Sequence, residues 1–320
     1  MASWNVFKFC TALRALGGVM VAVVLGVVGF TYYAVVLVSY GPLLLRGTLS
    51  SLLALAVLLL FHTLLGMLLW SYLATVLTDP GGVPPEWTPA VDEERGEGDP
   101  SVGSANADSV ALLLDQASTA GEVADQRRRF CRKCNRCKPP RCHHCSVCGR
   151  CVLKMDHHCV WVVNCIGALN YKYFLLFLFY TFLVTSLVTV SLMPPLIAFL
   201  TADGDDNDDN DDVSGRPGGL VAMFITCVLN LSFSLSVFGF LAMHVSLVRS
   251  NTTTIEIYEK KKGTQWQYDL GRRKNFEQVF GMDKRYWLLP AYSEEDKRFM
   301  PVLQGLEYPT RSNSDELRQL

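Results

Sequence analysis

Apolar residues along the chain are gathered into four long runs, and every charged residue lies outside them. No Asp, Glu, Lys or Arg occurs in residues 15–45, 47–78, 173–202 and 217–248. About 20 apolar residues in a helix cross the ~30 Å hydrocarbon core of a bilayer, and each run is longer than that. The pattern therefore predicts an α-helical polytopic membrane protein and excludes a soluble globular one. We place its four transmembrane helices at 15–40, 49–77, 173–200 and 220–248.

The basic residues between these runs are distributed unequally across the membrane. Because the helices cross in pairs, the N-terminus, the segment between the second and third helices and the C-terminal tail share one side. That side carries 27 of the 29 Lys and Arg residues. Cytosolic segments near a membrane carry an excess of Lys and Arg, so we expect these three segments to face the cytosol.

The polar segments have distinct compositions. We expect a cytosolic N-terminus over 1–14 and a cytosolic linker over 79–126, which is rich in Gly, Ser, Ala and acidic residues from 90 onwards. Such a composition predicts flexibility. The loop 201–219 holds seven aspartates in the ten residues 203–212 but lacks the residue order of a calcium-binding loop, so we expect a solvated lumenal loop. The remaining segments are a cysteine-rich domain over 127–172 and a cytosolic tail over 249–320.

Nine of the eleven cysteines fall within 35 residues, from Cys131 to Cys165. This density indicates disulfide bonds or metal ligands, and a reducing cytosol favours thiolates that bind zinc. Cys131/Cys134 and Cys145/Cys148 have the spacing with which two thiolates bind one zinc ion across a tight turn. Two four-ligand sites would use eight of the thirteen Cys and His residues here, which leaves several without a metal role.

Asp156, His157, His158 and Cys159 follow one another directly. Neighbouring side chains diverge on a helix or a strand, so one histidine can bind zinc while the other faces Cys159. A thiolate is the nucleophilic form of cysteine, and a nearby imidazole can take its proton. Asp156 could orient that imidazole. The same residues also fit a purely structural role as ligands or hydrogen-bonded supports, and their spacing favours neither reading.

The order of these residues closely resembles the cysteine-rich domain of the DHHC protein S-acyltransferases, a family of palmitoyltransferases. The matching positions are Cys131, Cys134, Lys138, Pro139, Arg141, His144, Cys145, Cys148, Cys151, Asp156, His157, His158, Cys159, Cys165, Asn170 and Phe174. Asp79-Pro80-Gly81 resembles the family's DPG motif, and Thr253-Thr254-Ile255-Glu256 its TTxE motif. The stretch from Trp4 to Cys10 is similar to plant members.

The resemblance implies two structural zinc ions and one catalytic cysteine. One ion would be held by Cys131, Cys134, His144 and Cys151, and the other by Cys145, Cys148, His158 and Cys165. Cys159 would carry the acyl group, with His157 as general base and Asp156 beside it. Thr253, Thr254, Glu256 and Asn170 would support the site. Cys137 and Cys142 fall at variable positions and are treated as bystanders.

The activity implied is the transfer of a long-chain acyl group, such as palmitoyl, from acyl-CoA to cysteine thiols of substrate proteins. The co-substrate is then acyl-CoA, although no single residue can be assigned to its phosphates. We expect membrane-associated substrate proteins with cytosolic cysteines, contact with the lipid bilayer and no nucleic-acid partner. The enzyme would reside in the Golgi, the ER or the plasma membrane, with its active site in the cytosol.

Two positions depart from the family pattern. Val160 and Val163 stand where the family usually has a proline and the first of two asparagines. Because valine does not fix φ as proline does, we expect a looser loop after Cys159.

Other functions fit the sequence less well. A non-catalytic, RING-like zinc module would end in a further Cys-x-x-Cys pair, whereas this segment ends with Cys159 and Cys165, which have five residues between them. A transporter would carry paired ionisable groups within its spans. His62 and His244 have no acidic partner in any span, and we expect them to be neutral histidines facing the bundle.

Two motifs of the tail also have structural readings. Thr253 and Glu256 fit a helix capping box, in which each side chain bonds the other residue's backbone N–H. Asn275, Phe276, Val279 and Phe280 loosely resemble a C-terminal family motif, and equally fit an amphipathic segment lying on the membrane.

Overall fold

The computed structural model describes residues 17–45, 47, 49–88, 129–201, 217–259 and 266–311. The predicted N-terminus 1–14 with its plant-like stretch, the linker from 90 to 126 and the aspartates of 203–212 lie outside the described residues.

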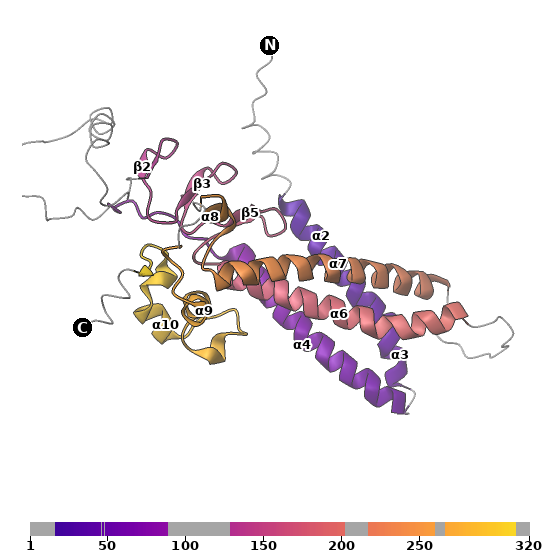
Figure 1. Cartoon of the computed structure of the whole chain (residues 1–320). Coiled ribbons are helices and arrows are strands. Elements are labelled where there is room, and N and C mark those ends of the chain that lie inside the picture. The colour runs from indigo at the N-terminus through magenta and orange to yellow at the C-terminus, as the bar shows by residue number, and fades with distance from the viewer. Residues whose placement is uncertain are drawn as a thin grey trace, which may run out of the picture.

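Four helical spans in the described part of the chain are long and apolar enough to cross a membrane. The first is Gly17–Leu44, made of α2 (Gly17–Tyr32), a π-helical segment (Tyr33–Tyr40) and α3 (Gly41–Leu44); the others are α4 (Leu49–Leu77), α6 (Tyr171–Thr201) and α7 (Pro217–Arg249). They form an elongated bundle with the short strands at one end (Figure 1). A helix satisfies its own backbone hydrogen bonds, which is why unbroken apolar runs take this form in lipid.

The bundle core is built mainly against α6. Val184, Val188 and Leu192 of α6 are buried with Phe61 of α4 and Val35 of the first span. Many other apolar side chains of the spans face outward, as expected for helices that contact lipid. The core of the bundle thus leaves an apolar outer surface for the bilayer.

Three antiparallel two-stranded hairpins make up the cysteine-rich domain, which lies between the second and third spans. They pair β1 (Phe130–Cys131) with β2 (Arg136–Cys137), β3 (His143–Cys145) with β4 (Arg150–Val152), and β5 (His157–Cys159) with β6 (Asn164–Ile166). Strands this short bury little apolar surface and cannot hold such a fold by themselves. Further cross-links between the hairpins are needed to stabilise the domain.

Asn164 joins the third hairpin to the bundle. Its side-chain amide donates to the backbone carbonyls of Thr75 (3.2 Å) and Thr78 (2.9 Å) at the end of α4. The last carbonyls of a helix have no partner within the helix, so this asparagine satisfies groups that would otherwise be unpaired. The hairpin is thereby fixed at the C-terminal end of α4.

α6 begins at Tyr171 and so includes Lys172, a charge that the apolar pattern places outside the third span. The Lys172 side chain is buried, and its ammonium donates to the carbonyls of Phe280 (3.2 Å) and Ala291 (2.5 Å). It also lies 4.2 Å from the centre of the Tyr292 ring. These partners come from the C-terminal tail, which explains how a buried lysine is accommodated at the start of a membrane helix.

The tail folds against this end of the bundle. It contains α8 (Thr254–Glu259), α9 (Arg272–Phe280) and α10 (Glu294–Phe299), with 3-10 turns at Lys284–Tyr286 and Pro301–Gln304. The described tail is thus a packed layer beside the hairpins (Figure 1). Asn275 of α9 donates to the carbonyl of Arg249 (2.8 Å), and Tyr180 of α6 donates to that of Leu288 (2.7 Å).

A buried ion pair connects the cysteine-rich domain to the tail. The Arg141 guanidinium donates to both carboxylate oxygens of Glu256 at 2.7 Å, and to the side chain and carbonyl of Asn251 at 2.9 Å. It also lies over the rings of Tyr268 and Tyr308, 4.7 and 4.9 Å from their centres. Taking two charges out of water is costly, but this geometry gives each of them several charge-assisted hydrogen bonds.

Glu256→Gln is expected to destabilise the protein by about 3–5 kcal/mol, because it leaves the Arg141 charge buried without a counter-charge. Thermal unfolding of the zinc-loaded protein in detergent measures the effect. Glu259→Gln is the matched control, since Glu259 lies on the same helix with a half-exposed side chain and a longer 3.6 Å contact to Arg129. Such a surface pair contributes about 0–1 kcal/mol. Equal melting temperatures for the two variants would contradict the importance of the buried pair.

Candidate active site

The structure brings the eight predicted ligands together as two separate clusters. The first cluster is Cys131, Cys134, His144 and Cys151, and the second is Cys145, Cys148, His158 and Cys165. In the first, Nδ1 of His144 lies 3.6, 3.2 and 3.9 Å from the Sγ atoms of Cys131, Cys134 and Cys151. In the second, Nδ1 of His158 lies 3.8, 3.4 and 3.5 Å from those of Cys145, Cys148 and Cys165.

These distances fit a tetrahedral metal site. Bonds of 2.3 Å to sulfur and about 2.0–2.1 Å to nitrogen place neighbouring S and N ligands of zinc about 3.6 Å apart, and two S ligands about 3.8 Å apart. Cys148 and Cys165 are 3.4 Å apart in the second cluster, and Cys134 and Cys151 are 3.7 Å apart in the first. Each cluster could therefore hold a metal ion in a closed, four-ligand site.

Strand alternation distributes the ligands between the two clusters. His144 and Cys145 are neighbours on β3, so their side chains point to opposite faces and serve different clusters. Register completes each set: His144 is paired with Cys151 across the second hairpin, and His158 with Cys165 across the third. The second hairpin belongs to both clusters, so a metal in each would tie all three hairpins together.

The same alternation separates the two histidines of the central motif. On β5, His157 and Cys159 share one face while His158 points to the other, into the second cluster. Cys159 is not a member of either cluster of described residues, and its side chain is 7% exposed. A cysteine without a metal partner therefore lies on the same strand face as a histidine.

Asp156 bonds His157, with 2.7 Å between the carboxylate Oδ2 and Nδ1. Burial by itself would raise the pKa of Asp156, but the hydrogen bond and charge of His157 and the N–H of Thr254 lower it overall. Burial likewise opposes a charged His157, yet its contacts with Asp156 and Cys159 raise the pKa of the imidazole to about 9. The arrangement favours the imidazolium form of His157.

The TTxE residues reach this group from the start of α8. The N–H of Thr254 donates to Oδ1 of Asp156 (2.9 Å), and its hydroxyl to the Asp156 carbonyl (2.7 Å). Thr253 and Glu256 form the capping box, with 2.9 Å from the Thr253 N–H to Glu256 and 3.3 Å from the Glu256 N–H to the Thr253 hydroxyl. Glu256 thus serves both the cap and the pair with Arg141.

Asn170 lies fully buried at the base of the third hairpin. Its side chain accepts from the N–H of Gly167 (2.9 Å) and donates to the carbonyl of Cys165 (2.8 Å). These bonds close the turn between β6 and α6. Asn170 therefore shapes the backbone that carries a ligand of the second cluster.

A cavity of about 890 Å³ opens at Cys159 and runs between the spans. His157 and Trp161 lie with Cys159 at one part of its wall, and apolar side chains from all four spans form most of the rest. Thr31 and Asn230 also line it and are hydrogen-bonded to each other across the first and fourth spans (3.2 Å). Its size and apolar lining are typical of a ligand site.

Several contributors to the site have no local sequence signal. Asn251 donates to the carbonyl of Tyr268 (2.7 Å) and accepts from Arg141, and Asn164 caps α4 as described. His244, expected only as a neutral histidine facing the bundle, lies in the Asp156–His157 group. Their partners are distant in the chain, so only the fold reveals them.

The two bystander cysteines lie outside both clusters of described residues. Cys142 is fully buried, and burial raises the pKa of its thiol to about 11. A thiol of this kind is unreactive at neutral pH. Cys137 is partly exposed on β2.

Val163 has a left-handed backbone, with φ of +53°. A β-branched residue is strained in this region, which asparagine tolerates much better. Val163 also packs closely on Gly17 of α2, where an added Cβ would meet its Cγ1. The departure from the family's asparagine therefore strains the loop after Cys159 while it provides a contact with the first span.

Comparison with known proteins agrees with this geometry. The model of the DHHC palmitoyltransferase family matches residues 124–261. "Probable protein S-acyltransferase 14" of Arabidopsis thaliana is 64% identical over 98% of this chain and 97% of its own length. "Palmitoyltransferase ZDHHC20" of Bos taurus is 36% identical over 97% of this chain and 81% of its own length. The chain belongs to the DHHC palmitoyltransferase family, and is thus an acyltransferase.

Cys148→Ala is expected to lower bound zinc from about two ions per chain to about one and to destabilise the domain, because structural zinc contributes folding free energy. Atomic absorption on the purified protein and its melting temperature measure both effects. Cys137→Ala removes a nearby thiol that belongs to neither cluster, and should retain both ions. Equal zinc content in the two variants would argue against the second site.

Val163→Asn is expected to stabilise the protein by about 1 kcal/mol, because it relieves the left-handed strain of a β-branched residue. The melting temperature should rise accordingly. Val163→Ala removes the same contact with Gly17, but alanine does not tolerate a left-handed backbone as asparagine does. The alanine variant should therefore not be stabilised. An asparagine variant no more stable than the alanine variant would mean that strain is not the dominant effect.

Proposed function

We propose that this protein transfers a long-chain acyl group from acyl-CoA to cysteine thiols of membrane-associated proteins, with Cys159 as the acyl carrier. The observation that carries the proposal is the position of Cys159. It is free of both metal-ligand clusters, shares a strand face with a histidine that is bonded to Asp156, and opens onto the apolar cavity. The relatives' names as S-acyltransferases and palmitoyltransferases support this reading.

The first half-reaction forms acyl-Cys159. His157 takes the thiol proton, and the Cys159 thiolate attacks the thioester carbonyl. The carbon–sulfur bond to CoA breaks, and the departing CoA thiolate receives the proton from the His157 imidazolium. Asp156 remains ionised and keeps the imidazole oriented.

The second half-reaction runs the same exchange in the other direction. A cysteine thiol of the substrate protein gives its proton to His157 and attacks acyl-Cys159. Its new thioester forms as the bond to Cys159 breaks and the proton returns to Cys159. One thioester is exchanged for another in each step, so no oxidant or further energy source is needed.

The cavity explains why this chemistry occurs at a membrane. Burial of an acyl chain contributes about 0.8 kcal/mol per methylene, so the chain lies among the spans while the polar CoA remains in water. The thioester carbonyl then meets Cys159 where the two regions join. Arg and Lys residues of the cysteine-rich domain would attract the CoA phosphates.

The zinc identity and the membrane orientation belong to the same proposal. Two zinc ions would hold the hairpins closed and play no part in the chemistry. The excess of Lys and Arg supports a cytosolic site, where acyl-CoA and substrate cysteines are accessible. We assign the protein to the endomembrane system or the plasma membrane, with membrane-associated proteins as its substrates.

Purified wild-type protein incubated with labelled palmitoyl-CoA should form a covalent adduct that hydroxylamine releases, because hydroxylamine cleaves thioesters. Cys159→Ala should form none. Cys137→Ala is the matched control, since it removes a partly exposed cysteine from the same domain and should label as wild type does. Wild type without an adduct, or Cys159→Ala that labels equally, would refute the proposal.

A further inference from the structure

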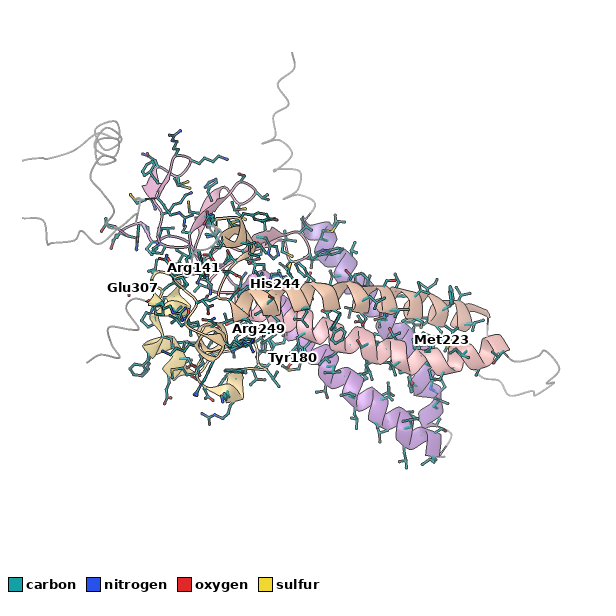
Figure 2. The ribbon with its side chains drawn as sticks, viewed as in Figure 1. Arg141, Tyr180, Met223, His244, Arg249 and Glu307 are labelled. Atoms are coloured by element: carbon teal, nitrogen blue, oxygen red, sulfur yellow. The ribbon has the colours of Figure 1, made fainter. Side chains whose placement is uncertain are left out.

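His244 lies at the end of α7 that adjoins the cysteine-rich domain (Figure 2) and is 0% exposed. Aromatic rings surround it: its ring centre is 4.6 Å from Phe240, 5.2 Å from Phe174 and 5.8 Å from His157. The contacts with the two phenylalanines are edge-on, with interplanar angles of 83° and 79°. Packed rings in this arrangement leave little freedom to rotate.

Tyr171, the first residue of α6, holds this histidine in place. Its hydroxyl is hydrogen-bonded to Nδ1 of His244 at 3.1 Å, and both side chains are buried. Nε2, the other ring nitrogen, has no hydrogen-bond partner among the described residues. A buried polar atom left unpaired costs free energy, which suggests that the ring has a role beyond packing.

His244 lies beside Asp156 and His157. A ring nitrogen of His244, a ring nitrogen of His157 and a carboxylate oxygen of Asp156 all lie within 4.8 Å of one another. The Asp156 carboxylate already accepts from His157 and from the N–H and hydroxyl of Thr254. His244 covers the side of this group that faces the bundle, while α8 covers it from the tail.

We propose that His244 is a positioning residue, which together with Tyr171 holds the imidazole of His157 between Asp156 and Cys159. The His244 ring lies 5.8 Å from the ring of His157, centre to centre, and its own position is fixed by Phe174, Phe240 and the hydroxyl of Tyr171. A ring held in this way blocks the rotation that would take His157 away from Cys159. This role rests on the acyl-transfer function proposed above.

The test compares His244→Phe, which keeps a ring in the cage, with Tyr171→Phe, which removes only a hydroxyl. Tyr180→Phe is the matched control, because it removes one hydroxyl from the same helix at a bond to the Leu288 carbonyl. Two rates are measured on zinc-loaded protein at one pH: alkylation of Cys159 by iodoacetamide, read by peptide mass spectrometry, and acylation by palmitoyl-CoA. Alkylation reports the reactivity of the Cys159 sulfur and needs no acyl transfer.

His244→Phe should slow both reactions about tenfold or more, since misplaced catalytic groups lose rate steeply. Tyr171→Phe should slow them less, and the double variant should be no slower than His244→Phe alone, because Tyr171 acts through His244. Tyr180→Phe should react as wild type does. Melting temperature and a zinc content of two per chain separate these effects from unfolding.

Wild-type alkylation rates in both zinc-loaded single variants, or multiplicative effects in the double variant, would overturn the proposal. A third zinc ion in wild type that His244→Phe loses would also overturn it, in favour of a metal site. If His244→Phe does not fold, the alkylation rate of Tyr171→Phe tests the proposal, and a wild-type rate in that variant would overturn it. If the variants change the alkylation rate as expected but the wild-type protein accepts no palmitoyl group, the acyl-transfer function is refuted and the positioning role stands.

Discussion

The buried pair of Arg141 and Glu256 is the interaction on which the rest of the site depends. Two charges without access to water are stable only while every partner around them stays in place. That requirement fixes α8 against the segment that leads into the second hairpin, and α8 in turn supplies the Thr254 N–H and hydroxyl to Asp156. Asp156 in turn is hydrogen-bonded to Nδ1 of His157. A constraint at Glu256, more than 90 positions along the chain from His157, therefore reaches that histidine through α8 and Asp156.

Strand alternation provides the second level of organisation. The period of two sends His144 and Cys145 to different clusters, and it sends His158 to a cluster while His157 stays with Cys159. Short hairpins allow this arrangement because two consecutive strand residues point to opposite faces and can belong to different sites. A helix would have turned the same residues by about 100° steps, which cannot place two neighbours on opposite faces.

The sequence predicted the features that depend on local pattern. Charge-free runs predicted the four spans, and cysteine density predicted a cysteine-rich domain with metal-ligand clusters between the second and third; the spans, the domain and two clusters that could hold metal ions are confirmed. The roles of Cys159, His157 and Asp156 remain predictions. The pattern did not reveal Lys172 inside α6, Asn164 at the end of α4 or His244 beside His157, because each depends on partners from another segment. Nor could it show that Val163 occupies a left-handed backbone, since that follows from how the loop closes on α2.

The order of these segments along the chain has a consequence for biosynthesis. Cys159 is synthesised nearly a hundred residues before Thr254, whose N–H and hydroxyl support Asp156, and before His244 on the fourth span. A ribosome adds about 5–20 residues per second, so Cys159 exists in the nascent chain for several seconds without its complete surroundings. The contacts around Asp156 and His157 are complete only after the last span has entered the bilayer and the tail has folded back. A truncated or unfinished chain therefore carries the cysteine motif without the residues that surround it in the folded protein.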